Sequence, residues 1–180
     1  MKRNVYSLLM AVAMLFLIAG NASAQRWFYD DGGSDRNRNQ IGIDLGVGKM
    51  SDINGNVGFM GGLRYMYNVH RFVGWDVIGV NYVGQTVKGD GIGPSILQGM
   101  MGLRGRTPNI YETVSAYTGL RMGYGYDWFV EEGGLALEFN LGLNVTPNVS
   151  VGYVFNMQKV NLGSDAKYKF NGFRIGFTLP

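Results

Sequence analysis

The chain has 180 residues, no cysteine, 29 glycines and a formal net charge of +3, and two of its positive charges are Lys2 and Arg3 at the very start. The lack of cysteine excludes a disulfide scaffold and a lipid anchor on cysteine. The nearly neutral remainder gives no reason to expect nucleic acid as a partner. Glycine is abundant, proline is rare and aromatic residues are frequent. This composition excludes collagen and disorder and favours strands that pack or bend tightly.

The N-terminus has the pattern of a secretion signal. An apolar run from Leu8 to Ala19 follows the two positive residues, and Ala22-Ser23-Ala24 is a small-x-small cleavage site. The apolar run is shorter than the ~20 residues that a membrane helix needs, so we favour a cleaved leader over an uncleaved anchor helix. The sequence therefore predicts a signal peptide over residues 1–24, with cleavage between Ala24 and Gln25.

Residues 25–39 are polar and rich in Asp and Arg, with an aromatic triplet at Trp27-Phe28-Tyr29. We interpret this segment as a polar N-terminal tail in the periplasm. The aromatic triplet could rest at a membrane interface, but the composition favours a simple linker.

From Gln40 to the end, eight segments place apolar side chains on one face and glycine, small polar or charged side chains on the other. Side chains alternate between the two faces of a strand, so the alternation predicts eight strands with one apolar face each. In chain order they are Ile41–Lys49, Val57–Val69, Phe72–Gln85, Ile96–Arg106, Tyr111–Tyr126, Leu135–Val145, Val149–Gln158 and Tyr168–Leu179.

The sixth and third segments are the clearest and the least clear of these strands. Every odd position of Leu135–Val145 is Leu, Phe or Val, and the even positions are Ala, Glu, Asn and Gly. In the third segment Trp75 indicates one phase and Val80 the other. A β-bulge between them would reconcile the two phases.

Short turns and longer loops are expected to alternate between the strands. The tripeptide Thr-Pro-Asn occurs at 107–109 and again at 146–148, and a third tight connection is expected near His70. Pro and Asn suit the central positions of a tight turn. Three short turns and four longer loops match the short periplasmic turns and long external loops of outer-membrane barrels. This places both termini on the periplasmic side.

The fold predicted for residues 40–180 is all-β: an eight-stranded antiparallel up-and-down transmembrane β-barrel. Closure of the sheet removes strand edges, whose unpaired N–H and C=O groups are too costly in hydrocarbon. The alternative is a soluble barrel of the lipocalin type, which is apolar inside. The face that is not apolar carries six charged residues that we expect in a narrow polar lumen: Asp44, Arg64, Arg104, Arg121, Glu138 and Arg174.

These six residues are predicted to form a charge network inside the barrel. The interior of an eight-stranded barrel is just wide enough for side chains, and isolated buried charge is very costly. The charges should therefore pair, with Asp76 as a further member whose strand phase is ambiguous. A packed polar plug is the favoured interpretation, and a gated conduit is the alternative.

The leader, the alternation and aromatic strands such as Gly62-Leu63-Arg64-Tyr65-Met66-Tyr67 resemble the OmpA/OmpX-like outer-membrane β-barrel superfamily. The nearest resemblance is to the "outer membrane protein beta-barrel domain" group of Bacteroidetes-type bacteria. It implies residence in the outer membrane of a Gram-negative cell, in contact with its lipid and lipopolysaccharide. It also implies insertion by the barrel-assembly machinery through a final strand with aromatic residues. Phe173 and Phe177 fit that strand, whereas the chain ends Thr178-Leu179-Pro180.

The functional hypothesis is a non-enzymatic barrel that anchors external loops for a structural or interaction role, with a surface ligand bound through those loops. The first alternative is narrow porin-like or lateral transport of small molecules. The second is a lipid-modifying enzyme, since enzymes on such barrels use His with Ser or other polar partners. The one histidine, His70, is expected in a periplasmic turn. No catalytic residue, cofactor or metal ligand is expected.

Overall fold

The computed structural model describes residues 38–51, 57–70, 72–85, 93–111, 113–159 and 167–179. The predicted signal peptide, its cleavage site between Ala24 and Gln25, and residues 25–37 of the predicted tail lie outside the described residues. Within the described residues, no helix is long and apolar enough to cross a membrane.

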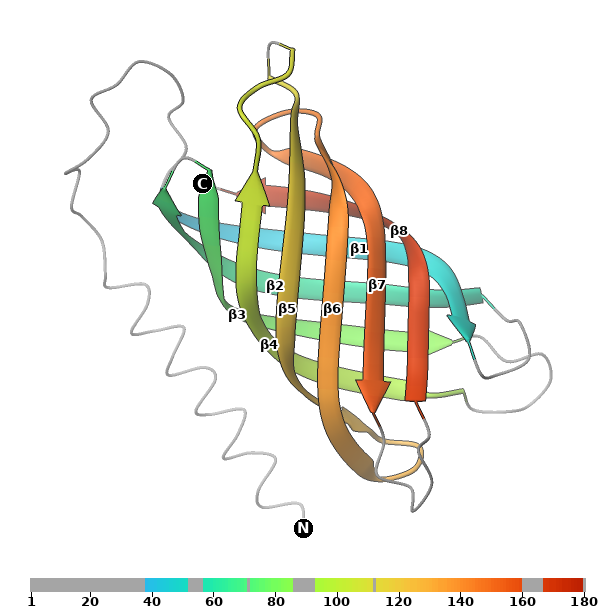
Figure 1. Ribbon diagram of the computed structural model, residues 1–180. Helices are drawn as coiled ribbons and strands as arrows, with labels where there is room; N and C mark the ends of the chain where they lie inside the picture. Colours follow the sequence, from blue (N-terminus) through green and yellow to red (C-terminus); the bar gives the residue numbers. More distant parts are fainter. Residues whose placement is uncertain are drawn as a thin grey trace. The chain divides into compact units, whose positions relative to one another are not determined.

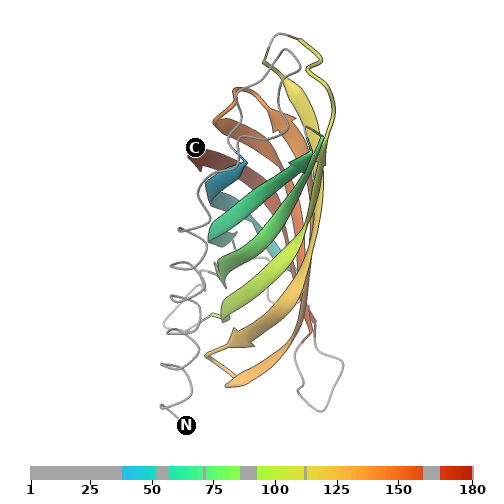
Figure 2. The ribbon, with the colours of Figure 1, turned by 90° about the vertical axis from the view of Figure 1, so that its left-hand side faces the viewer.

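Eight strands form one closed antiparallel barrel in simple chain order (Figure 1). Each strand pairs with its neighbours in the chain, and the first strand pairs with the last, from Ile41↔Leu179 to Ser51↔Lys169. In Figure 1 the strands of one wall cross those of the opposite wall steeply, and Figure 2 shows the same inclination from the side. Strands must tilt in this way for a sheet to close.

The strands are β1 Asn39–Ser51, β2 Val57–His70, β3 Val73–Gln85, β4 Ser95–Arg106, β5 Ser115–Asp127, β6 Glu132–Asn144, β7 Val149–Lys159 and β8 Lys167–Leu179.

The predicted inside and outside faces of the strands are confirmed. In β6, Leu141 and Leu143 are 48% and 43% exposed on the outer wall, while Asn140 between Phe139 and Leu141 is fully buried. The same alternation runs through β2, where Leu63 is exposed and Arg64 is buried. The barrel is thus apolar outside and largely polar inside, the reverse of a lipocalin-type barrel.

A bulge in β3 is confirmed where the sequence changes phase. Tyr65 pairs with Ile78 and Met66 pairs with Asp76, so Val77 is the extra residue. The strand therefore turns Trp75 outward and Asp76 inward before the bulge, and Tyr82 outward after it. This settles the position of Asp76, which lies in the lumen with 1% of its surface exposed.

Two connections differ from the expected alternation of short turns and long loops. Residues 107–114 form a long connection between β4 and β5, whereas residues 128–131 form a short one between β5 and β6. The fifth strand starts at Ser115 and not at Tyr111, because Tyr111 and Val114 pair with each other in a small turn of their own. The prediction of a short turn at 107–109 was wrong.

The second copy of the Thr-Pro-Asn tripeptide does make a short turn, between β6 and β7. Its hydroxyl, Thr146 Oγ1, accepts hydrogen bonds from the backbone N–H groups of Asn148 and Val149, at 3.2 and 3.0 Å. In the first copy Thr107 Oγ1 instead accepts from the N–H of Ala116 at 3.0 Å. The two copies of the tripeptide therefore adopt two different connection geometries.

The barrel has two ends, which we call the terminal end and the loop end. The terminal end carries Asn39, Leu179 and the β2–β3, β4–β5 and β6–β7 connections. The loop end carries the β1–β2, β3–β4, β5–β6 and β7–β8 connections.

Candidate functional site: the charged lumen

The six residues of the predicted charge network all point into the barrel. Five of them are 0–1% exposed, and Arg104 is partly exposed towards the terminal end. The β3 bulge adds Asp76 to the set. Local alternation explains each position, since every member has outward-facing apolar or glycine neighbours on its strand.

One end of the network joins β1, β2 and β8. Arg64 Nη1 donates to Asp44 Oδ2 over 2.9 Å, and Arg174 Nη1 lies 3.7 Å from the same oxygen. Gly42 lies against the Arg64 side chain, and a Cβ at this position would come within 2.9 Å of Arg64 Cγ. The absence of a side chain at Gly42 thus makes the room in which Arg64 reaches Asp44.

Glu138 receives hydrogen bonds from several strands at once. Arg121 donates to Oε1 from Nε at 2.9 Å and also from Nη2, and Arg174 Nη1 approaches the same oxygen at 3.3 Å. Two amides add to these, from Asn140 Nδ2 at 3.0 Å and from Asn81 Nδ2 at 2.9 Å. Hydrogen bonds to an ionised acceptor are the strong class. This carboxylate therefore links β3, β5, β6 and β8 through the lumen.

Tyr117 fills the lumen beside this network. Its hydroxyl accepts a hydrogen bond from Arg174 Nη2 at 3.2 Å, and the Arg104 guanidinium lies 4.9 Å from the ring centre. Gly142 and Gly152 face each other under the ring. A Cβ at Gly152 would lie 2.6 Å from the tyrosine oxygen, so the glycine pair provides the space for the ring.

A layer of amide side chains lies towards the loop end, and sequence reasoning did not include it in the network. Gln98 and Asn156 exchange hydrogen bonds of 2.9 and 2.8 Å, and Gln158 Nε2 donates to the carbonyl of Gly125 at 2.9 Å. All three side chains are 0–2% exposed. Their place on the inner face was visible from the alternation, but the prediction followed charge alone.

Beside these amides, the lumen that was predicted to be packed and polar also contains a hydrophobic cluster near the loop end. A cluster of buried hydrophobic residues closes this half of the barrel: Met50, Met60, Val83, Ile96, Val154 and Phe170. Most of them lie at the loop ends of their strands. In the residues that the structure describes, the interior thus contains ion pairs and, towards the loop end, amides and hydrophobic residues side by side, since Asn156 pairs with Phe170.

The histidine lies apart from the lumen. His70 ends β2 at the terminal end, is exposed, and accepts a hydrogen bond on Nδ1 from the N–H of Phe72 at 3.4 Å. Its ring lies 5.5 Å from that of Phe72. No cluster of three or more His, Cys, Asp or Glu residues suited to a metal ion occurs in the described part of the chain.

No family model matches this chain, and no curated protein matches it. Solved structures do match. Neisserial surface protein A is 16% identical with a TM-score of 0.58, covering 78% of this chain and 97% of its own. The outer membrane enzyme PagL is 12% identical with a TM-score of 0.56, covering 76% of this chain and 98% of its own. The N-terminal β-barrel domain of Pseudomonas aeruginosa OprF is 10% identical with a TM-score of 0.51, covering 80% and 100%.

The chain has the fold of the small outer-membrane β-barrels. The resemblance to OmpA/OmpX-like barrels is thereby confirmed at the level of the fold. These small outer-membrane barrels include a surface protein and an enzyme. The fold therefore does not determine the activity, which has to be argued from the side chains.

Proposed function

We propose that this protein is a non-enzymatic barrel of the bacterial outer membrane that holds its loop end towards the outside of the cell for a structural or interaction role. The observation that carries the proposal is the filled lumen, which contains ion pairs, amides and a hydrophobic cluster. An interior filled in this way supports an anchor rather than a conduit.

The outer wall supports residence in lipid. Leu45, Leu103 and Phe173 are 56%, 60% and 72% exposed on three different strands. Exposed apolar surface on this scale is unusual for a soluble monomer, and hydrocarbon is the medium that accommodates it. Outer-membrane lipid and lipopolysaccharide are thus the proposed surroundings, reached after secretion by the predicted signal peptide and insertion by the barrel-assembly machinery.

The position of His70 favours the non-enzymatic role over a lipid-modifying one. It lies at the terminal end, and its Nδ1 is engaged by the backbone of Phe72. In the proposed orientation that end faces the periplasm, away from the outer leaflet where the lipid of lipopolysaccharide lies. A surface ligand would instead meet the loop end, where Trp128 and Phe129 are each 56% exposed.

Single-channel recording in planar lipid bilayers tests the filled lumen. The wild-type protein is expected to show no stable open level, because ion pairs and the hydrophobic cluster fill the lumen of the described barrel. The triple variant R121A/E138A/F170A, which removes side chains from both, serves as the matched control and should admit current. A steady open level in the wild type would contradict the proposal and support the transport alternative.

Labelling of intact cells tests the orientation separately. The chain has no cysteine, so single substitutions W128C at the loop end and N148C at the terminal end give clean targets. A membrane-impermeant thiol reagent should label W128C in whole cells and N148C only after the outer membrane is opened. The reverse pattern would invert the proposed topology.

A further inference from the structure

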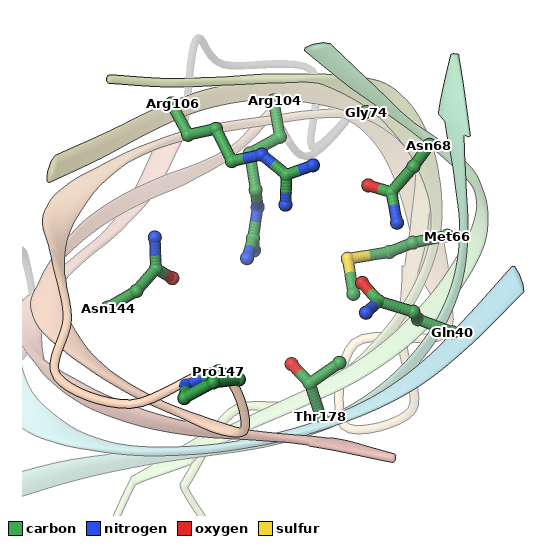
Figure 3. A pocket seen from close by; sticks show the side chains of 9 residues that line it. All are labelled: Gln40, Met66, Asn68, Gly74, Arg104, Arg106, Asn144, Pro147 and Thr178. Carbon is green, nitrogen blue, oxygen red and sulfur yellow. The ribbon is translucent and has the colours of Figure 1, made fainter. Parts of the chain in front are cut away.

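A pocket opens inside the barrel at the terminal end, between the strands (Figure 3). Its polar lining comes from Gln40 on β1, Asn68 on β2, Arg104 and Arg106 on β4, Asn144 on β6 and Thr178 on β8. Figure 3 shows the guanidinium groups of both arginines directed into the space that the other side chains surround. The pocket volume is about 20 Å³, which is room for one or two water molecules.

Not every arginine of the charge network is closely paired beside this pocket. Four arginines and three carboxylates form the network, namely Arg64, Arg104, Arg121, Arg174, Asp44, Asp76 and Glu138. Three of the arginines each have a carboxylate within 4.0 Å. In the part of the chain that the structure describes, Arg104 has none, and its charged group contacts only the face of the Tyr117 ring.

The Arg104 guanidinium is also poorly hydrogen-bonded. Among the described residues, Arg104 Nε and Nη2 are buried atoms without a hydrogen-bond partner. Asp76 on the neighbouring strand attracts Arg104 from beyond 4.0 Å, but buried N–H groups without an acceptor remain costly. The described residues that line the pocket include no carboxylate, so the lining supplies no anion to offset this cost.

We propose that this pocket binds a small inorganic anion of about the size of chloride, with Arg104 as its principal ligand. The anion would accept hydrogen bonds from the N–H groups of the Arg104 guanidinium that have no partner among the described residues. The amide N–H groups of Asn144 and Gln40 and the hydroxyl of Thr178 are further donors around the same space. Room for one or two water molecules suits a halide, which is about the size of a water molecule. The site is reached from the terminal end, since its lining residues stand at that end of their strands.

Chloride binding to the folded protein in nonionic detergent micelles provides the test. Chloride replaces gluconate at constant ionic strength, and both the ³⁵Cl NMR line width and the thermal unfolding midpoint are followed. We expect saturable line broadening and a rise in the midpoint for the wild type. R104Q should weaken binding by about tenfold or more, because it removes the charged donor of the hydrogen bonds to the anion.

Three further variants keep this test decisive. K49Q removes an exposed cation at the loop end and should bind chloride as the wild type does. R104K retains the charge and should bind more tightly than R104Q. T178V removes one donor at nearly constant volume and should weaken binding even if R104Q fails to fold. The proposal is overturned if wild-type broadening does not saturate, or if R104Q and T178V both bind chloride as strongly as K49Q does.

Discussion

Arg121 and Glu138 are direct partners across the β5–β6 pair, and Arg121 Nε donates to Glu138 Oε1 over 2.9 Å. Both side chains are fully buried. Because Arg174 reaches the same carboxylate from β8, this pair ties one side of the barrel to the other through its interior. The stability of the barrel should therefore depend strongly on Glu138.

The substitution E138Q should destabilise the barrel by about 3–5 kcal/mol, the range found when one partner of a buried ion pair is removed. It leaves the Arg121 guanidinium without its main counter-charge. Urea unfolding in phospholipid vesicles measures the loss. E131Q, at an exposed loop position, is the control and should change stability by less than about 0.5 kcal/mol. Equal stability of E138Q and E131Q would show that the pair is not needed.

Substitutions at neighbouring positions of β6 should separate lipid from lumen. L141R places a charge on the outer wall and should cost about 2–4 kcal/mol at the middle of the membrane. N140R, one residue away, places its charge inside, next to the Glu138 carboxylate that Asn140 contacts at 3.0 Å. Its effect should therefore change in an R121Q background, whereas that of L141R should not.

Thiol labelling gives an independent check on this assignment. L141C in vesicles should resist a water-soluble thiol reagent because lipid covers it. Rapid labelling of L141C, together with equal costs for the two arginine variants, would refute the inside and outside faces assigned to β6.

The hydrophobic cluster at the loop end should behave as a protein core. Phe170 is 1% exposed inside the barrel, so F170A should destabilise by about 3–5 kcal/mol through lost contacts and the cavity left behind. F170L removes less of the side chain and should therefore cost clearly less than F170A. Urea unfolding of the two variants is compared, and a cost for F170A no larger than that for F170L would mean that the loop half of the lumen is not packed.

Y117F should lower stability by about 1.5–3 kcal/mol, because it removes the acceptor of the Arg174 hydrogen bond in a buried site at constant shape. The matched control is Y153F. Tyr153 lies on the outer wall, 41% exposed, with its ring against Phe173, and that ring contact survives the change. Unfolding midpoints of the two variants should differ clearly, and identical midpoints would remove Tyr117 from the network.

Alternation along the chain was enough to predict the strands and their faces, because successive side chains lie on opposite faces in every strand of a sheet. It even located the β3 bulge, since Trp75 and Val80 could not share one phase without it. The connections were less predictable. Thr107 and Thr146 begin identical tripeptides, but their hydroxyls bond to different partners, which neighbouring strands supply.

The pairing inside the lumen could not be predicted from the alternation. Which arginine meets which carboxylate depends on the stagger between strands across the barrel, and the sequence shows only the face of each. Phe170 and Val154 also face inward, on strands whose other inward side chains include Arg174 and Asn156. The sequence does not show whether an apolar residue packs against lipid or inside the lumen, so the hydrophobic cluster was not predicted.

The central claim is that lipid surrounds the outer wall of this barrel. Refolding of residues 25–180 from urea, with and without phospholipid vesicles, tests it most directly. We expect a folded, protease-resistant barrel only when vesicles or detergent micelles are present, and aggregation in buffer alone. A monomeric, β-structured and soluble protein in buffer alone would contradict the claim.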